Sequence, residues 1–275
     1  MHKFLFQLTV LIYFVSTAGF LVHVVTLRKD VERVATSVLT GGFVLHTVAV
    51  LWRWWAAGHP PFVNLHDALS SLAWAIVGVF LLFQMRYRIK SLGAFVTPVA
   101  LCTIAASSLQ PKEILPLPPV LKSAWLPFHA AICLLSYAVF VLAFCAAVMY
   151  LMQEREIKMK RLGGIFKRLP SLQSIDAMNK RCLTVGFTLL TIGIVTGSIW
   201  AEQAWGEYWS WDPKETWSLI TWFLYAALLH QRITIGWRGR KVAIMTIVAF
   251  ATLVFTFLGV SLILPGAHSY ASWFK

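Results

Sequence analysis

Tryptophan is concentrated in one short segment of the chain. Five tryptophans fall within 18 residues, and another follows at position 222: Trp200, Trp205, Trp209, Trp211 and Trp217. An aromatic belt at a membrane interface needs only one or two such residues at each helix end. A denser cluster forms a flat apolar surface, which suits a large planar ligand. The segment therefore predicts a binding platform, with Tyr208 as a further aromatic member.

The other residues of this segment indicate how the platform is shaped. Gly206 allows close approach of a ligand to the backbone. Asp212-Pro213 disfavours helix before the proline and is typical of a helix entry, with Pro213 in the first turn. The nearby carboxylates could orient a ligand or a partner, or could simply be solvated: Glu202, Glu207, Asp212 and Glu215.

Histidine is the other residue type here that suits chemistry. A single histidine at the end of an apolar run, such as His129 or His268, is more often an interfacial hydrogen-bonding residue than a ligand. His230 lies inside an apolar run, and an ionisable residue at membrane depth is a functional candidate. His23 and His46 are weaker candidates of the same kind.

Two further groups of residues are interpreted as structural. We expect His66 to be a helix-start residue, with Asn64 as N-cap. The cysteines form no CxxC pair and lie in or at the ends of apolar runs, so we expect small buried hydrophobic residues rather than disulfides or metal ligands: Cys102, Cys133, Cys145 and Cys182.

The composition requires a membrane environment for these residues. Hydrophobic residues make up 59% of the 275, charged residues only 13%, and the mean hydropathy is +0.71. A soluble domain carries about 25% charged residues. Because a bilayer-spanning helix needs about 20 mostly apolar residues, we predict an all-α polytopic protein, a single membrane domain over 1–275, with eight spans: 4–27, 35–55, 65–85, 91–109, 128–152, 182–201, 215–232 and 242–264. We interpret the first run as a span and not as a cleaved leader, since it exceeds a typical leader's apolar region.

The distribution of lysine and arginine predicts the orientation of the spans. The net charge is +13, and eighteen of the 24 basic residues fall in one set of loops, which marks the cytoplasmic side. This pattern favours membrane topology over nucleic-acid binding. Both termini and the segment 200–217 are then predicted to face out, and the basic connector 153–181 to lie in the cytoplasm, near lipid head groups.

Three motifs in order resemble one known family. WGEYWSWDPKETW at 205–217 resembles the tryptophan-rich WWD signature of haem-handling proteins, and its DPKET part resembles the CcsA/ResC family of system II cytochrome c biogenesis. SAWLPFH at 123–129 and GAHSY at 266–270 are similar to that family's two histidine segments. The resemblance covers at least residues 60–275.

The resemblance implies a function and a set of site residues. The WWD segment would contact haem b, with Trp205, Trp209, Trp211 and Asp212 as its catalytic part. His129, His268 and His230 would be ligands to haem iron, the first two at the outer surface and the third within the membrane; the residues that would line the haem are Trp200, Trp205, Gly206, Tyr208, Trp209, Trp211 and Trp217. The implied activity is holocytochrome c synthesis, together with a CcsB/ResB-like subunit, on apocytochromes that carry CxxCH.

The predicted topology agrees with this assignment and leaves alternatives open. His129 opens a span at the outer side, His268 lies just beyond an outer span end, and imidazole suits haem iron. The alternatives are a haem exporter or delivery protein of the WWD superfamily and a b-type electron-transfer subunit. The expected location is a bacterial cytoplasmic membrane, and a thylakoid is the less favoured choice because the N-terminus does not resemble a transit peptide.

Overall fold

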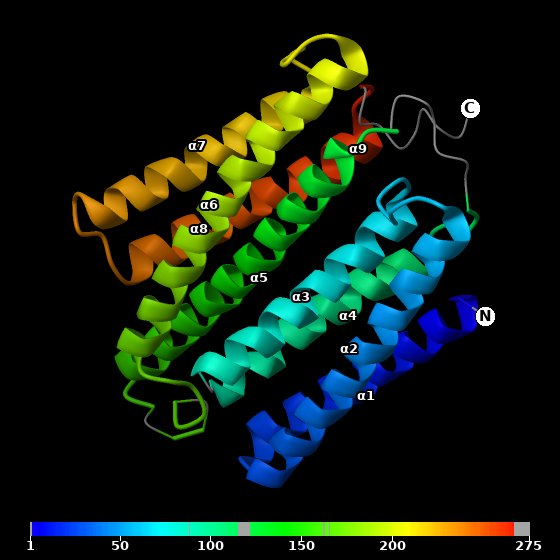
Figure 1. The fold of residues 1–275 in the computed structure, drawn as a ribbon. Coiled ribbons are helices and arrows are strands. Elements are labelled where there is room, and N and C mark those ends of the chain that lie inside the picture. The colour runs from blue at the N-terminus through cyan, green and yellow to red at the C-terminus, as the bar shows by residue number, and fades with distance from the viewer. Residues whose placement is uncertain (1, 88, 115–121, 162, 165, 267–275) are drawn as a thin grey trace. The chain divides into compact units, whose positions relative to one another are not determined.

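The computed structural model describes residues 2–87, 89–114, 122–161, 163–164 and 166–266. Every regular element in these ranges is a helix (Figure 1), which confirms the predicted all-α class. The chain divides into two compact units, residues 1–117 with 160–170 and residues 118–159 with 171–275.

The first unit is built from four long helices. They are α1 (His2–Thr26), α2 (Lys29–Ala57), α3 (Leu65–Tyr87) and α4 (Gly93–Ser108), the last preceded by the 3-10 turn η1 (Lys90–Leu92). Helix α1 packs against α2 and α4, and α3 packs against α4 and α2. Asn64 accepts a hydrogen bond from the Asp67 amide at 2.8 Å, so its predicted capping role at the start of α3 is confirmed.

The second unit is arranged around α5. It contains α5 (Trp125–Lys158), α6 (Leu172–Trp205), α7 (Pro213–Ile233) and α8 (Arg240–Val254), which continues through a π-helical turn η3 (Phe255–Gly259) into α9 (Val260–Ile263). Helix α5 packs against α6 and α8, and α7 packs against the same two helices. In the core, the Phe140 ring stacks on Tyr225 at 3.7 Å between centroids.

Seven helices in the described ranges are long and apolar enough to cross a membrane. Helix α7 is the remaining long one, and polar residues at both of its ends shorten its apolar stretch: Lys214, Glu215, His230, Gln231 and Arg232. The multi-pass membrane prediction is confirmed. The outward orientation of both termini stays a prediction, as does the single membrane domain.

Two details of the sequence prediction were wrong. Helix α5 runs to Lys158 and α6 begins at Leu172, so the cytoplasmic connector predicted over 153–181 is largely helical. A helix can continue beyond its apolar stretch where its charged side chains form ion pairs with one another, as Lys158 and Glu154 do at 2.8 Å. Cys102 is exposed, since an apolar residue in a membrane helix can face lipid instead of protein, whereas Cys145 and Cys182 are buried as expected.

A buried ion pair ties α6 to α7 at the end of the unit where α5 finishes. The guanidinium of Arg232 donates to the Asp176 carboxylate and carbonyl, both at 2.7 Å, and to the Asn179 side chain at 3.0 Å. The Arg232 side chain is only 3% exposed. A charge removed from solvent in this way is stable only while its partners are present.

Removing one member of this pair should destabilise the protein. We expect Arg232→Met to lower the free energy of unfolding by about 3 kcal/mol, because it leaves Asp176 partly buried without its cation. Arg240→Met is the matched control, since the Arg240 side chain is 58% exposed and its pair with Glu154 should contribute under about 1 kcal/mol. Thermal unfolding of the purified variants in detergent checks the difference; equal losses would contradict the prediction.

Candidate functional site

The contact between α5 and α6 fixes one face of the site. The imidazole of His129 lies near the start of α5, and its Nδ1 donates to the carbonyl of Gly193 on α6 at 2.8 Å. A proton on Nδ1 places the lone pair of the neutral ring on Nε2, the arrangement that orients histidine ligands in metal sites. In the described part of the chain, Nε2 has no hydrogen-bond partner. Among the described residues, Nε2 is therefore the ring nitrogen of His129 that is left for a further contact.

Two glycines one helical turn apart make this contact possible. A Cβ built on Gly197 would lie 2.7 Å from His129 Cε1, and one on Gly193 would lie 2.7 Å from Cys133 Sγ. Small residues four positions apart let two membrane helices approach closely. The GIVTG sequence at 193–197 has this spacing of small residues, although Gly193 and Gly197 were not predicted as site residues.

The indoles continue the site from the imidazole along α6. The ring of Trp200 is nearly parallel to that of His129, at 6.1 Å and 16°, and only 3% of Trp200 is exposed. Trp205 meets Trp200 edge to face at 4.8 Å and is itself partly exposed. The rings of His129, Trp200 and Trp205, from two helices, thus contact one another in series.

The loop that follows is shorter than predicted and presents its aromatic residues outward. Because α6 extends to Trp205 and α7 begins at Pro213, only 206–212 are non-helical. Gly206 ends α6 with φ of +81°, and the space beside its Cα is open. Trp211 has φ of +59°, an unfavourable conformation for an aromatic residue, and its side chain is 69% exposed. Strain that holds a large apolar ring outside the protein is a feature of functional sites.

The DPKET part of the motif builds the start of α7. Asp212 accepts a hydrogen bond from the Lys214 amide at 2.9 Å, and Glu215 accepts from the amides of Ser210 and Asp212, which completes a capping box. Of the carboxylates considered as ligand-orienting groups, these two serve the backbone of the loop. The catalytic role predicted for Asp212 stays a prediction.

Three contacts join this loop and the start of α7 to the C-terminal part of the described chain. Lys214 Nζ donates to Ser261 Oγ on α9 at 2.9 Å. A Cβ built on Gly266 would overlap the Asp212 carboxylate, so the last described residue lies directly against the loop. Trp217 packs on Phe255 of the π-helical turn, at 4.5 Å between centroids. Such turns are frequent at functional sites in helical proteins.

The remaining histidines have different surroundings. His230 lies in the last turn of α7, exposed, about 25 Å along the helix from the loop. His268 lies outside the described residues. His23 is bonded to the carbonyl of Arg28 at 2.9 Å, and His46 lies between Tyr13 and Ser70 at 3.1 and 3.0 Å.

The predicted site residues are therefore brought together only in part. The structure assembles one group at the loop end of the second unit: His129, Trp200, Trp205, Gly206, Tyr208, Trp209, Trp211, Asp212 and Trp217. His230 belongs to the opposite end of α7. Gly193, Gly197 and Lys214 are additional members that hold the group in place.

Comparison with known proteins identifies the family of this chain. A model of the cytochrome C assembly protein family matches residues 62–268. The cytochrome c biogenesis protein CcsA of Synechococcus sp. (strain CC9605) is 37% identical over 256 residues, 84% of each chain. Proteins with the same name from Pyropia yezoensis and Chlamydomonas reinhardtii are 36% and 39% identical, over 87% and 82% of this chain.

A solved structure shares the fold. Cytochrome c Heme Lyase CcmF matches with a TM-score of 0.66 and 17% identity, over 94% of this chain and 46% of that one, so the chain spans under half of that protein. The family match covers most of the sequence and includes the tryptophan-rich loop. The chain belongs to the cytochrome C assembly family, as a CcsA-type cytochrome c biogenesis protein.

Proposed function

We propose that this protein is the haem-presenting subunit of a system II cytochrome c synthase. Its substrates would be haem b and an apocytochrome with a CxxCH motif, and a CcsB/ResB-like membrane subunit would act with it. The observation that carries the proposal is His129, whose Nδ1 is held by Gly193 and whose Nε2 is available beside a row of indoles. That combination suits a large, flat, metal-containing substrate.

The surroundings of His129 fit haem in three respects. A neutral imidazole is a good ligand for haem iron. The exposed rings of Trp205, Tyr208 and Trp211 offer apolar area to a porphyrin, and the burial of that area would supply most of the binding free energy. His268 would be the second axial ligand. The contact of Gly266 with Asp212 supports this role, because it brings the chain to the loop two positions before His268.

The reaction needs no nucleophile from this chain. Each thiol of the apocytochrome adds across one haem vinyl group: the sulfur forms a bond to one vinyl carbon, the hydrogen goes to the other, and no electrons are gained or lost. The role of the protein would be to hold haem with its vinyl edge accessible, so that proximity increases the rate. Trp209, Trp211 and Asp212 would define that edge.

His230 would bind haem on its way through the membrane. Its side chain is exposed on the surface of this chain, so a companion subunit could supply the second ligand. This exposure also favours the second candidate function, a haem exporter without synthase activity. A b-type electron-transfer role has less support, because both ring nitrogens of His46 are engaged, one with Tyr13 and the other with Ser70. We propose the bacterial cytoplasmic membrane as the location, with the loop on the outer side.

Substitution of the three histidines tests the ligand assignments. In a complex purified with the companion subunit, we expect His129→Ala and His268→Ala to lose outer-site haem and His230→Ala to lose haem from both sites. Added imidazole should restore haem and cytochrome c formation in the first two variants but not in the third, because free imidazole can replace a ligand but not a transfer step. Absorption spectra and haem content are the measurements.

The outcomes separate the two candidate functions. Unchanged haem content and spectra in all three variants would refute the site. Haem release outside the membrane without any need for apocytochrome would favour the exporter. Capture of a complex of haem, apocytochrome and this protein would favour the synthase.

A single methyl group at Gly197 should disturb the site without replacing any proposed ligand. The Cβ of Gly197→Ala would lie 2.7 Å from the His129 ring, so the imidazole must move and the bond to Gly193 must weaken. We expect haem binding to weaken at least about tenfold, which is about the effect of losing the hydrogen bond that orients His129. Gly41→Ala is the control, because Gly41 is also helical and nothing lies within 4 Å of its added Cβ. Equal haem affinities in the two variants would count against the geometry.

A further inference from the structure

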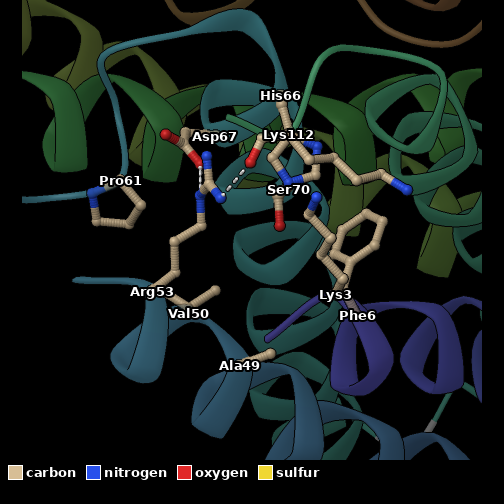
Figure 2. Close-up of a pocket in the computed structure, with 10 residues that line it drawn as sticks. All are labelled: Lys3, Phe6, Ala49, Val50, Arg53, Pro61, His66, Asp67, Ser70 and Lys112. Atoms are coloured by element: carbon tan, nitrogen blue, oxygen red, sulfur yellow. Dashed lines mark hydrogen bonds and ion pairs between the residues drawn. The ribbon is translucent and has the colours of Figure 1, made fainter. Parts of the chain in front are cut away.

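A pocket lies in the first unit, which does not contain the tryptophan-rich loop. It is formed by the N-terminal end of α1, the C-terminal end of α2, the start of α3 and the segment after α4 (Figure 2). Its lining combines cationic and apolar side chains, among them Lys3, Phe6, Val50, Arg53, His66 and Lys112.

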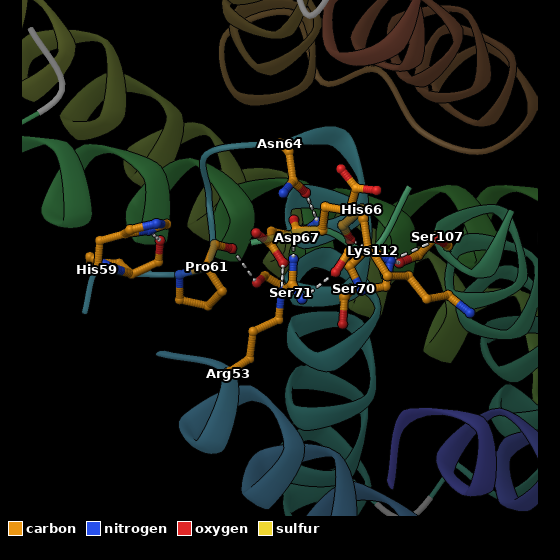
Figure 3. Close-up of polar contacts among 12 residues, drawn as sticks. Arg53, His59, Pro61, Asn64, His66, Asp67, Ser70, Ser71, Ser107 and Lys112 are labelled. Carbon is orange, nitrogen blue, oxygen red and sulfur yellow. Dashed lines mark hydrogen bonds and ion pairs between the residues drawn. The ribbon is translucent and has the colours of Figure 1, made fainter. Parts of the chain in front are cut away.

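An internal ion pair builds the wall of this pocket. The Arg53 guanidinium contacts the Asp67 carboxylate, and both side chains are almost fully buried. Arg53 also donates to the carbonyls of Lys112 and Glu113, at 3.0 and 3.3 Å (Figure 3). One arginine thus holds the segment after α4 against α2 and α3. The position of Lys112 at the pocket is a consequence of that bonding.

The pocket has an excess of positive charge. Asp67 is the one carboxylate among its described lining residues, and Arg53 neutralises it. Lys3 and Lys112 form no ion pair with any described residue, and Lys112 Nζ lies 5.5 Å from the centre of the Phe6 ring. Two ammonium groups without a carboxylate partner beside an apolar wall favour an anionic group as ligand.

The floor of the pocket can donate a further hydrogen bond. Tyr13 OH lies 3.1 Å from His46 Nδ1, and His46 Nε2 lies 3.0 Å from Ser70 Oγ. When the tyrosine hydroxyl donates to Nδ1, Nε2 carries the ring proton and donates to Ser70 Oγ. The Ser70 hydroxyl then accepts that bond and can donate its own proton to a ligand. This series of hydrogen bonds gives a role to His46, a buried histidine that the proposed function does not use.

Neighbouring tryptophans give the depth of the pocket in the membrane. Trp52, Trp54 and Trp55 flank Arg53 at the end of α2 and are 37%, 44% and 77% exposed. Exposed tryptophans at a helix end mark the level of lipid head groups. We propose that this pocket binds the phosphate of an anionic phospholipid, with Lys3, Lys112 and Ser70 as its donors and the lipid chains along the exposed apolar faces of α1 and α2. The proposal does not rest on haem binding or synthase activity.

Lipid retention by the purified full-length protein tests the proposal. Native mass spectrometry in detergent would measure binding of phosphatidylglycerol and of zwitterionic phosphatidylcholine. We expect wild type to prefer phosphatidylglycerol, and Lys3→Gln/Lys112→Gln to bind it on the order of tenfold more weakly, since each basic residue near an anionic lipid contributes several-fold. Lys3→Arg/Lys112→Arg should retain the preference, because the positive charges remain.

The controls separate this pocket from general charge effects. Lys29→Gln/Lys122→Gln removes the same total charge at exposed positions outside the pocket. A loss in this variant equal to that of the pocket variant would overturn the proposal, as would equal wild-type affinity for the two lipids. Inorganic phosphate is the second probe: displacement of lipid at millimolar concentration would identify free phosphate as the ligand, and persistence of the lipid supports the phospholipid. Unfolding temperatures of all variants show whether each one is folded.

Discussion

The close approach of α5 and α6 is the constraint on which the candidate site depends. Membrane helices gain little from hydrophobic burial against one another, so they associate through packing and polar contacts. Gly193 and Gly197 remove the side chains that would separate the two helices. The same approach lets the Gly193 carbonyl accept the Nδ1 proton of His129. One packing contact therefore determines both the distance between the helices and which imidazole nitrogen is available.

The WWD segment divides into residues that build the loop and residues that the loop displays. Asp212, Glu215 and Lys214 satisfy backbone amides or anchor α7 to α9. Their polar groups hold a tight turn, in which backbone amides would otherwise lack hydrogen-bond partners. This turn keeps Trp211 in a strained backbone conformation with its ring exposed. Local hydrogen bonding thus compensates for the cost of presenting an apolar surface.

Much of the fold could be predicted from the sequence because membrane helices are long and apolar. The eight predicted runs correspond to the long helices of the structure, and Asn64 acts as the predicted cap. Helix ends were less predictable, since α5 continues through charged residues that pair with each other. The predicted topology placed His129 and the tryptophan-rich segment on the same side, and the structure brings the rings of His129 and Trp200 together. The bond from His129 to Gly193 did not, because it depends on which faces of two helices meet.

Buried charge marks the parts of this protein that the hydrophobic pattern does not explain. Arg53 and Arg232 both lie near helix ends, and each binds a carboxylate and at least one backbone carbonyl from another segment. A guanidinium has five donors in a rigid fork, so it can join several segments at one point. The desolvation cost of such a group makes it a poor source of net stability and a good source of specificity. Each arginine joins two segments at a helix end. Arg53 holds the segment after α4 and so places Lys112 at the pocket, and Arg232 ties the end of α7, which carries His230, to α6.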